Sequence, residues 1–102
     1  MTREEQKIQF DTLIEQMKNI LLSKGHDYAF DEDVLSNFKV VGNICGIKPE
    51  LACLVLIATK VARLGVLLSS DKIPNNESIK DNMIDLNNYG VLLSMIHSEQ
   101  NN

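Results

Sequence analysis

The stretch PELACLVLIATKVARLGVLL, residues 49–68, is apolar around most of a helical circumference and begins with a proline. Proline suits the first turn of a helix, because an N–H at that position has no partner within the helix. A helix that is apolar on nearly every side needs cover on nearly every side, and a chain of 102 residues cannot supply all of it. The stretch therefore predicts a largely buried helix, part of which packs against another subunit of a homo-oligomer.

A first helix is expected ahead of this stretch. Apolar residues recur at spacings of three and four over residues 10–21, which is the pattern of one helical face. Thr2 and Glu5 have the spacing of a capping box. Gly25 readily adopts the left-handed conformation that ends helices, so we expect this helix to end near residues 23–24.

Two further helices complete the expected fold. Residues 34–45 resume the helical period and are followed by Gly46 as a stop signal. A last helix is expected from residue 77 to about residue 97, capped by Asn76 and followed by a frayed polar tail, residues 98–102. The whole chain of 102 residues is thus predicted to be one all-α domain, a compact bundle of about four helices completed by oligomerisation.

Composition excludes several classes of protein. The net charge of −4 and the lack of a basic tract argue against binding to duplex DNA or RNA. Cys45 and Cys53 are too few for a disulfide framework, and both are expected to be reduced and mostly buried. Residues 1–6 do not resemble a signal peptide, and Lys60 and Arg63 interrupt the longest apolar run. We therefore expect a cytoplasmic protein with no membrane partner.

Acidic side chains line one face of the expected last helix. Glu77, Asp81 and Asp85 are four residues apart, and Asn88, a candidate ligand-binding residue, follows on the same face. Like charges at this spacing repel, so a compensating cation is expected, either Mg²⁺ or basic side chains. The alternative is a solvated acidic face that partly complements the helix dipole.

Lys60 and Arg63 lie on a shared face of the central helix. A lysine point charge beside a forked guanidinium is suited to clamping a phosphate. The alternative is structural, with both cations paired to the carboxylates of the last helix. The two interpretations are compatible, because such ion pairs can open to admit a ligand.

The segment from Lys24 to Asp33 mixes glycine, charged and aromatic residues without a clear period, which is typical of a loop. Lys24, Asp27 and Tyr28 offer a cation, a carboxylate and a ring able to stack on a base. No nucleophile with an attendant base stands out anywhere in the chain, so we assign no catalytic residue. If the protein is an enzyme, metal-assisted hydrolysis is the expected class.

Several short motifs, taken in order, resemble one known family. They are the segment from Lys24 to Tyr28, Asn37-Phe38, Lys60 with Arg63-Leu64, Glu77-Ser78, Asp81, Asp85-Leu86 and Asn88-Tyr89. Their order resembles the nucleotide-modification-associated helical domain of phages and bacteria. That family is distantly similar to the all-α MazG and dUTPase-like nucleotide pyrophosphatases, which hold Mg²⁺ with carboxylates and usually work as oligomers.

The resemblance implies roles for particular residues. It places Glu77, Asp81 and Asp85 at an acidic site that could hold Mg²⁺, Lys60 and Arg63 near phosphate, and Asp27 and Tyr28 at the mouth. Those pyrophosphatases also present a paired-glutamate motif on a neighbouring helix, and this chain has cations there instead.

Three functions follow from these observations. The favoured one is binding of a phosphorylated nucleotide without turnover, in the manner of a phage anti-defence sponge that sequesters a host immune signalling nucleotide in the host cytoplasm. The others are a Mg²⁺-dependent nucleotide pyrophosphohydrolase and a helical oligomerisation scaffold. The missing second pair of carboxylates is the sequence feature that distinguishes nucleotide binding from pyrophosphohydrolysis.

Overall fold

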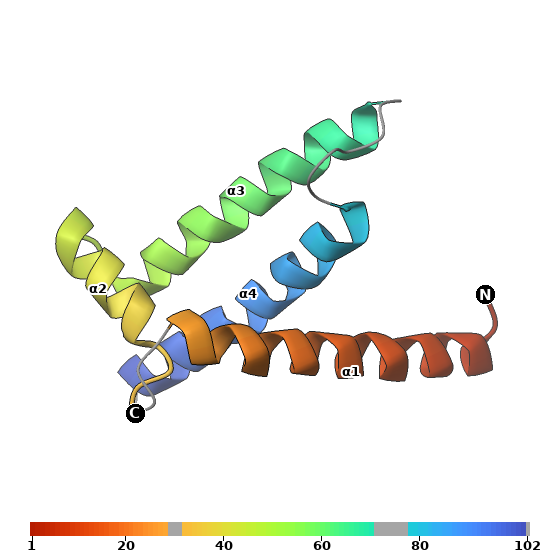
Figure 1. The fold of residues 1–102 in the computed structure, drawn as a ribbon, viewed down its shortest axis with the longest axis horizontal. Helices are drawn as coiled ribbons and strands as arrows, with labels where there is room; N and C mark the ends of the chain where they lie inside the picture. The colour runs from red at the N-terminus through yellow and green to blue at the C-terminus, as the bar shows by residue number, and fades with distance from the viewer. Residues whose placement is uncertain (29–31, 71–77, 102) are drawn as a thin grey trace.

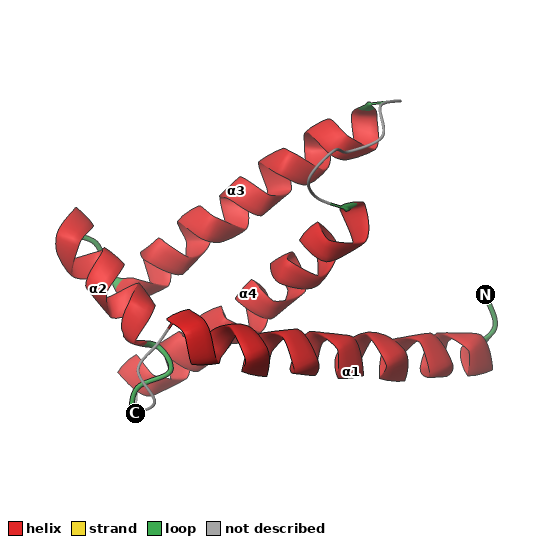
Figure 2. Ribbon diagram, in the orientation of Figure 1, coloured by secondary structure: helices red, strands yellow, loops and turns green. Residues whose placement is uncertain are grey.

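The computed structural model describes residues 1–28, 32–70 and 78–101, and the side chains of these ranges except those of residues 25–28. Its regular elements are four helices: α1 (Arg3–Tyr28), α2 (Ser36–Cys45), α3 (Pro49–Ser69) and α4 (Ile79–Gln100). Figures 1 and 2 show their arrangement, which confirms the predicted all-α fold with four helices.

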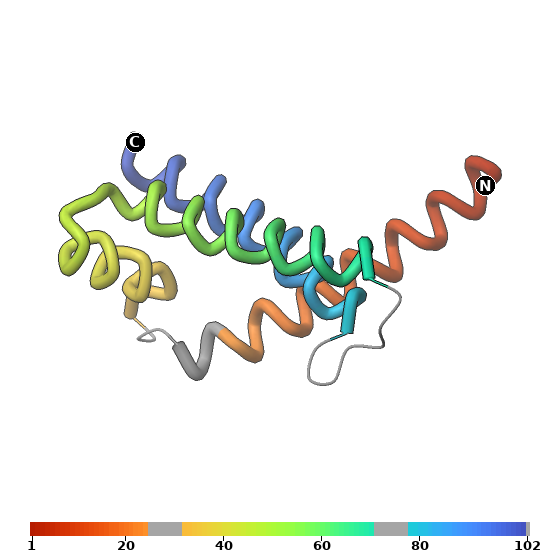
Figure 3. Tube along the Cα trace, turned by 90° about the horizontal axis from the view of Figure 1, so that it is seen from above, coloured from red at the N-terminus to blue at the C-terminus, as the bar shows by residue number. Residues whose placement is uncertain are grey.

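The helices α3 and α4 form the body of the molecule. They run in opposite directions and lie along one another, as the views from the side and from above agree (Figures 1 and 3). The short helix α2 packs against α3, whereas α1 packs against α4. The N-terminal half of α1 extends away from the other helices (Figure 3).

The hydrophobic core lies where α2, α3 and α4 meet. Partly buried side chains surround four buried ones, and the buried set is Leu35, Phe38, Cys53 and Ile96. The Cys53 thiol donates a hydrogen bond of 3.4 Å to the carbonyl oxygen of Tyr89, so even the thiol has a partner. Burial raises the pKa of this thiol and keeps it protonated.

The prediction for the end of α1 was wrong. The helix does not end near residues 23–24 but continues through Gly25 to Tyr28. A glycine inside a helix costs only about 1 kcal/mol relative to alanine, and tertiary contacts outweigh it here. Those contacts come from α4, where the Asn88 amide donates a hydrogen bond of 3.0 Å to the carbonyl oxygen of Met17 and Asp85 binds Lys24.

The N-terminal capping box of α1 is confirmed. The backbone N–H of Thr2 donates to Glu5 Oε2 at 2.8 Å, and the N–H of Glu5 donates to Thr2 Oγ1 at 3.1 Å. Two N–H groups that have no partner within the helix are thereby satisfied.

The end of α2 is also as predicted, because Gly46 adopts a left-handed conformation with φ of 69°. The sequence pattern did not reveal the role of Gly42, four residues earlier. A Cβ at Gly42 would lie 2.7 Å from the carbonyl oxygen of Ile47, so only glycine allows α2 to approach the start of α3 this closely.

The start of α4 differs from the prediction. Ser78 caps the helix, and its Oγ accepts a hydrogen bond of 2.9 Å from the N–H of Asp81. The expected cap, Asn76, lies outside the described residues. At the other end the helix continues to Gln100, so most of the expected polar tail is helical.

The central helix α3 is less covered than its composition suggests. Within one chain only Ala52, Cys53 and Leu64 are buried, and the expected burial of the rest depends on a second subunit, which stays a prediction. By length and composition alone α3 is also able to cross a membrane, although core helices of soluble proteins meet the same criteria. The expectation that both cysteines are buried was wrong for Cys45, which is exposed at the end of α2.

Candidate functional site

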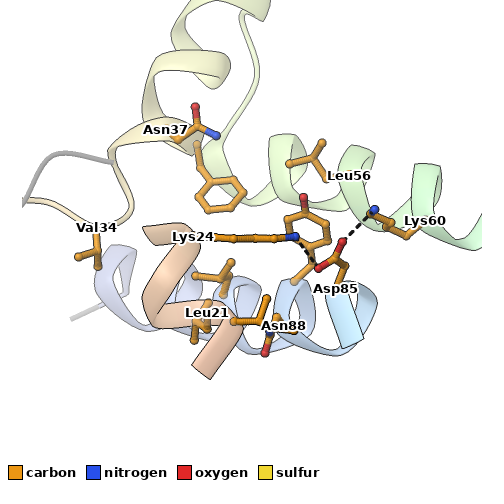
Figure 4. A pocket seen from close by; sticks show the side chains of 12 residues that line it. Leu21, Lys24, Val34, Asn37, Leu56, Lys60, Asp85 and Asn88 are labelled. Atoms are coloured by element: carbon orange, nitrogen blue, oxygen red, sulfur yellow. Dashed lines mark hydrogen bonds and ion pairs between the residues drawn. The ribbon is translucent and has the colours of Figure 1, made fainter. Parts of the chain in front are cut away.

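A pocket of about 240 Å³ opens where all four helices come together. Figure 4 shows Lys24 extending across it from α1, with Asn37 and Leu56 on one side and Leu21 and Asn88 on the other. The charged groups meet at one end, and the rest of the lining is apolar and aromatic apart from Asn37 and Asn88. The lining residues are Ile20, Leu21, Lys24, Val34, Asn37, Phe38, Leu56, Lys60, Asp85, Asn88, Tyr89 and Leu92.

The polar end of the pocket is organised around Asp85. Its Oδ1 lies 2.8 Å from Lys24 Nζ, and its Oδ2 lies 3.0 Å from Lys60 Nζ (Figure 4). The side chains of Asp85 and Lys60 are only 15% and 13% exposed, whereas that of Lys24 is 50% exposed. Two lysines against one aspartate leave the charged residues of the lining with a net charge of +1.

The pKa of Asp85 reflects a competition between two effects. Burial alone would raise the pKa of this carboxyl group, because desolvation disfavours the charged form. The hydrogen bonds and charges of Lys24 and Lys60 outweigh burial and hold the pKa of Asp85 below its ordinary value. Asp85 is therefore ionised at neutral pH.

Two buried asparagines on α4 hold the charged groups in place. Asn82 Oδ1 accepts a hydrogen bond of 3.3 Å from Lys60 Nζ, and the Asn82 amide donates to the carbonyl oxygen of Ser78 at 3.0 Å. Asn88, one turn beyond Asp85, fastens α4 to α1 through Met17. Asn82 thus fixes the position of the Lys60 ammonium group, and the packing of α1 against α4 fixes the direction from which Lys24 reaches Asp85.

The structure brings together three of the residues that the sequence predicted to bind a ligand. Lys24, Lys60 and Asn88 line one pocket, and Asp85 from the predicted metal set lies among them. Arg63 is exposed and does not line the pocket, so the cation beside Lys60 is Lys24 from another helix.

The predicted Mg²⁺ ligands are not assembled within the part of the chain that the structure describes. Asp81 is exposed and lies outside the pocket lining, and Glu77 falls outside the described residues. The described side chains contain no group of three or more histidine, cysteine, aspartate or glutamate residues that could hold a metal ion. The side chains of Asp27 and Tyr28, expected at the mouth, also lie outside the description.

Sequence reasoning did not assign three polar or aromatic residues of the pocket. Asn37 and Phe38 come from α2, and Tyr89 comes from α4 beside Asn88. The motifs Asn37-Phe38 and Asn88-Tyr89 carried the family resemblance, which was the available signal. Periodicity could not find them, because it assigned the apolar members to the core.

No family model, curated protein or solved structure matches this chain. The resemblance to the nucleotide-modification-associated family therefore stays a prediction.

Proposed function

We propose that the pocket binds one phosphorylated nucleotide unit and releases it chemically unchanged. The observation that carries this proposal is the pair of ammonium groups, Lys24 and Lys60, directed at one point from two helices across an apolar pocket. Convergent cations beside apolar and aromatic walls are what a phosphate attached to a base requires.

In this proposal Asp85 balances the charges of Lys24 and Lys60 when no ligand is bound. A phosphate group carries more charge and more acceptor oxygens than a carboxylate, so it competes well for the two ammonium groups. Lys24 is half exposed and can follow an incoming ligand, whereas Lys60 is held by Asn82. The net charge of +1 favours an anion even with Asp85 in place.

The remaining lining suits a base and limits the size of the ligand. Tyr89 and Phe38 provide aromatic surface, and Asn37 provides an amide able to form hydrogen bonds with a base edge. A volume of about 240 Å³ lies just below the range of roughly 300–1,000 Å³ usual for small-molecule sites. This volume argues against a ligand larger than one mononucleotide unit.

Binding without turnover is supported by the state of Asp85. Both of its oxygens already bind ammonium groups, and a cation beside each oxygen opposes Mg²⁺ at the same position. Hydrolysis assisted by Mg²⁺ needs carboxylates that are available to the metal. In this proposal the protein works in the cytoplasm, and its role as a sponge for an immune signalling nucleotide rests on an analogy with anti-defence sponge proteins.

The test is a titration of the protein with nucleoside mono-, di- and triphosphates and cyclic mononucleotides, with and without Mg²⁺, by calorimetry. Each mixture is then denatured and analysed by mass spectrometry. We expect one of these nucleotides to bind without Mg²⁺ and to be recovered intact. Release of pyrophosphate or of a nucleoside monophosphate would instead establish the pyrophosphohydrolase.

The variant Asp85→Asn distinguishes a phosphate site from a metal site by the sign of its effect. The substitution removes the carboxylate that competes with the phosphate. A phosphate and a carboxylate bound to the same ammonium group lie about 5 Å apart, and two unit charges at that distance repel by about 3 kcal/mol at an effective dielectric constant near 20. Even half of this repulsion corresponds to more than tenfold in Kd. We therefore expect tighter binding, whereas loss of a Mg²⁺ ligand would weaken it.

Lys60→Met should weaken binding by about 10- to 100-fold, because it removes one hydrogen bond between charged groups. Asp81→Asn is the matched control, since it neutralises an aspartate on the same helix that does not line the pocket. If Asp81→Asn and Asp85→Asn both abolish binding, the acidic row of α4 holds a metal and the proposal is wrong.

A further inference from the structure

One side of α3 is an uncovered apolar surface. The α3 face consists of Leu51, Leu54, Val55, Ala58, Ala62 and Val66, all of which are exposed. At 100° per residue they span an arc of about 120°, which is as wide as the apolar stripe that a helix normally buries in a protein core. The face carries no charge along its length.

The whole chain is also more extended than a compact monomer of the same size. Its accessible surface is 7636 Å², whereas a compact protein of 11.5 kDa exposes about 5,800 Å². The radius of gyration is 15.5 Å, against about 13 Å for a compact chain of this length. The excess surface is about twice the roughly 800 Å² that each partner contributes to a standard interface.

We propose that the α3 face binds the α3 face of a second copy of this chain about a two-fold axis. Ala58 and Ala62 lie near the middle of the face, and their small side chains allow two helices to approach closely. A two-fold axis places the same surface of both copies face to face, and only residues close to the axis meet their own counterparts. Two α3–α4 pairs joined in this way form a four-helix bundle, in which α3 becomes the central helix.

A lipid bilayer is a poorer fit to the same face. The helix α4 lies along α3, so inserting α3 would carry exposed Lys80, Asp81 and Asn87 into hydrocarbon. Charged side chains are strongly disfavoured in hydrocarbon, and α4 would bring two of them there. A second protein copy covers the α3 face without disturbing α4.

The dimer leaves the nucleotide pocket unobstructed. Lys60 lies about 200° around the helix from both Ala58 and Ala62, so it points to the opposite side of α3. The proposal is therefore independent of the proposed function, and either can fail alone.

The first test is the mass of the full chain by light scattering at about 100 µM, with helicity checked by circular dichroism. We expect twice the chain mass of 11.5 kDa for the unmodified protein. Val55→Glu should give the mass of one chain, because it places two like charges in an apolar interface. Val40→Glu on α2 is the matched control, since Val40 and Val55 are 49% and 57% exposed, and it should remain dimeric.

The second test locates the two-fold axis. In a Cys45→Ser background, Ala58→Cys or Ala62→Cys should give a disulfide-linked dimer under mild oxidation, whereas Asn19→Cys on exposed α1 should not. A monomeric unmodified chain, a dimeric Val55→Glu variant, or failure of both cysteines to cross-link would overturn the proposal. Flotation of the protein with liposomes would also overturn it, because the face would then bind lipid.

Discussion

Replacing Asp85 by asparagine should lower the stability of the fold markedly. The substitution keeps the shape of the side chain but removes the charge that holds two lysines from α1 and α3. Lys60, 13% exposed, would then have neutral amide oxygens as acceptors in place of the carboxylate, and it would face Lys24 without an intervening negative charge. The expected loss of stability therefore comes from a mostly buried Lys60 ammonium group that no longer has a negative partner.

The magnitude comes from the exposure of the partners. A hydrogen bond between charged groups contributes about 1.5–3 kcal/mol when it is well buried. The half-exposed Lys24 adds little, as surface ion pairs do, so we expect a total loss of about 2 kcal/mol. For a domain of about 100 residues, each kcal/mol shifts Tm by roughly 4–8 °C, which gives a fall of roughly 10 °C.

The assay is thermal unfolding followed by circular dichroism at pH 7. Asp81→Asn is the control, and it should cost only about 0.5 kcal/mol, because the exposed Asp81 mainly complements the helix dipole. The double variant Lys60→Met with Asp85→Asn should recover part of the loss, since no charge is then stranded. If Asp85→Asn melts within about 3 °C of the control, Asp85 does not stabilise the contact between these helices, and the reasoning is wrong.

Three further predictions concern pH, glycine and cysteine. The lowered pKa of Asp85 means that its stabilisation is present above about pH 4 and is lost as pH falls through the folded-state pKa, so the difference in Tm between the unmodified protein and Asp85→Asn should shrink in acid titrations. Gly42→Ala should destabilise the fold by about 2 kcal/mol in denaturant titrations, because its Cβ meets the Ile47 carbonyl, whereas Gly90→Ala, with open space around it, should stabilise it slightly; equal effects would contradict this packing. A thiol reagent should modify exposed Cys45 rapidly and buried Cys53 only upon unfolding, and mass spectrometry of a time course would reveal two fast reactions if this is incorrect.

The ends of the helices show what local sequence signals can and cannot predict. The capping box at Thr2 and the left-handed Gly46 were predicted correctly, because their hydrogen bonds and dihedral angles involve only neighbouring residues. The end of α1 was predicted wrongly, because Gly25 is a stop signal only when nothing distant favours continuation. Contacts with α4, which lies more than 60 residues away, favour it here.

The candidate site could be predicted in part. Lys60, Asp85 and Asn88 were chosen from the sequence as charged or polar residues on expected helices, whereas Lys24 was chosen from a segment that was expected to be a loop. Pairing of Lys60 with a carboxylate of the last helix was one of the predicted alternatives, and its ion pair with Asp85 confirms that part. The second partner of Asp85, Lys24, could not be predicted, since the helical period relates Lys60 to Arg63 on its own helix and does not relate it to Lys24. Tyr89 and Phe38 were hidden, because an aromatic residue that lines a pocket has the same spacing as one in the core.

The sequence by itself determined the class of the fold. Its apolar residues recur with a helical period and do not alternate as they do in strands, so packed helices are the arrangement that buries them. Tertiary structure decided which cation faces which carboxylate, because that depends on how α1 crosses α4 and how α3 lies beside it. The order of residues along one helix specifies which side chains share its face. Only packing between helices specifies what those side chains meet.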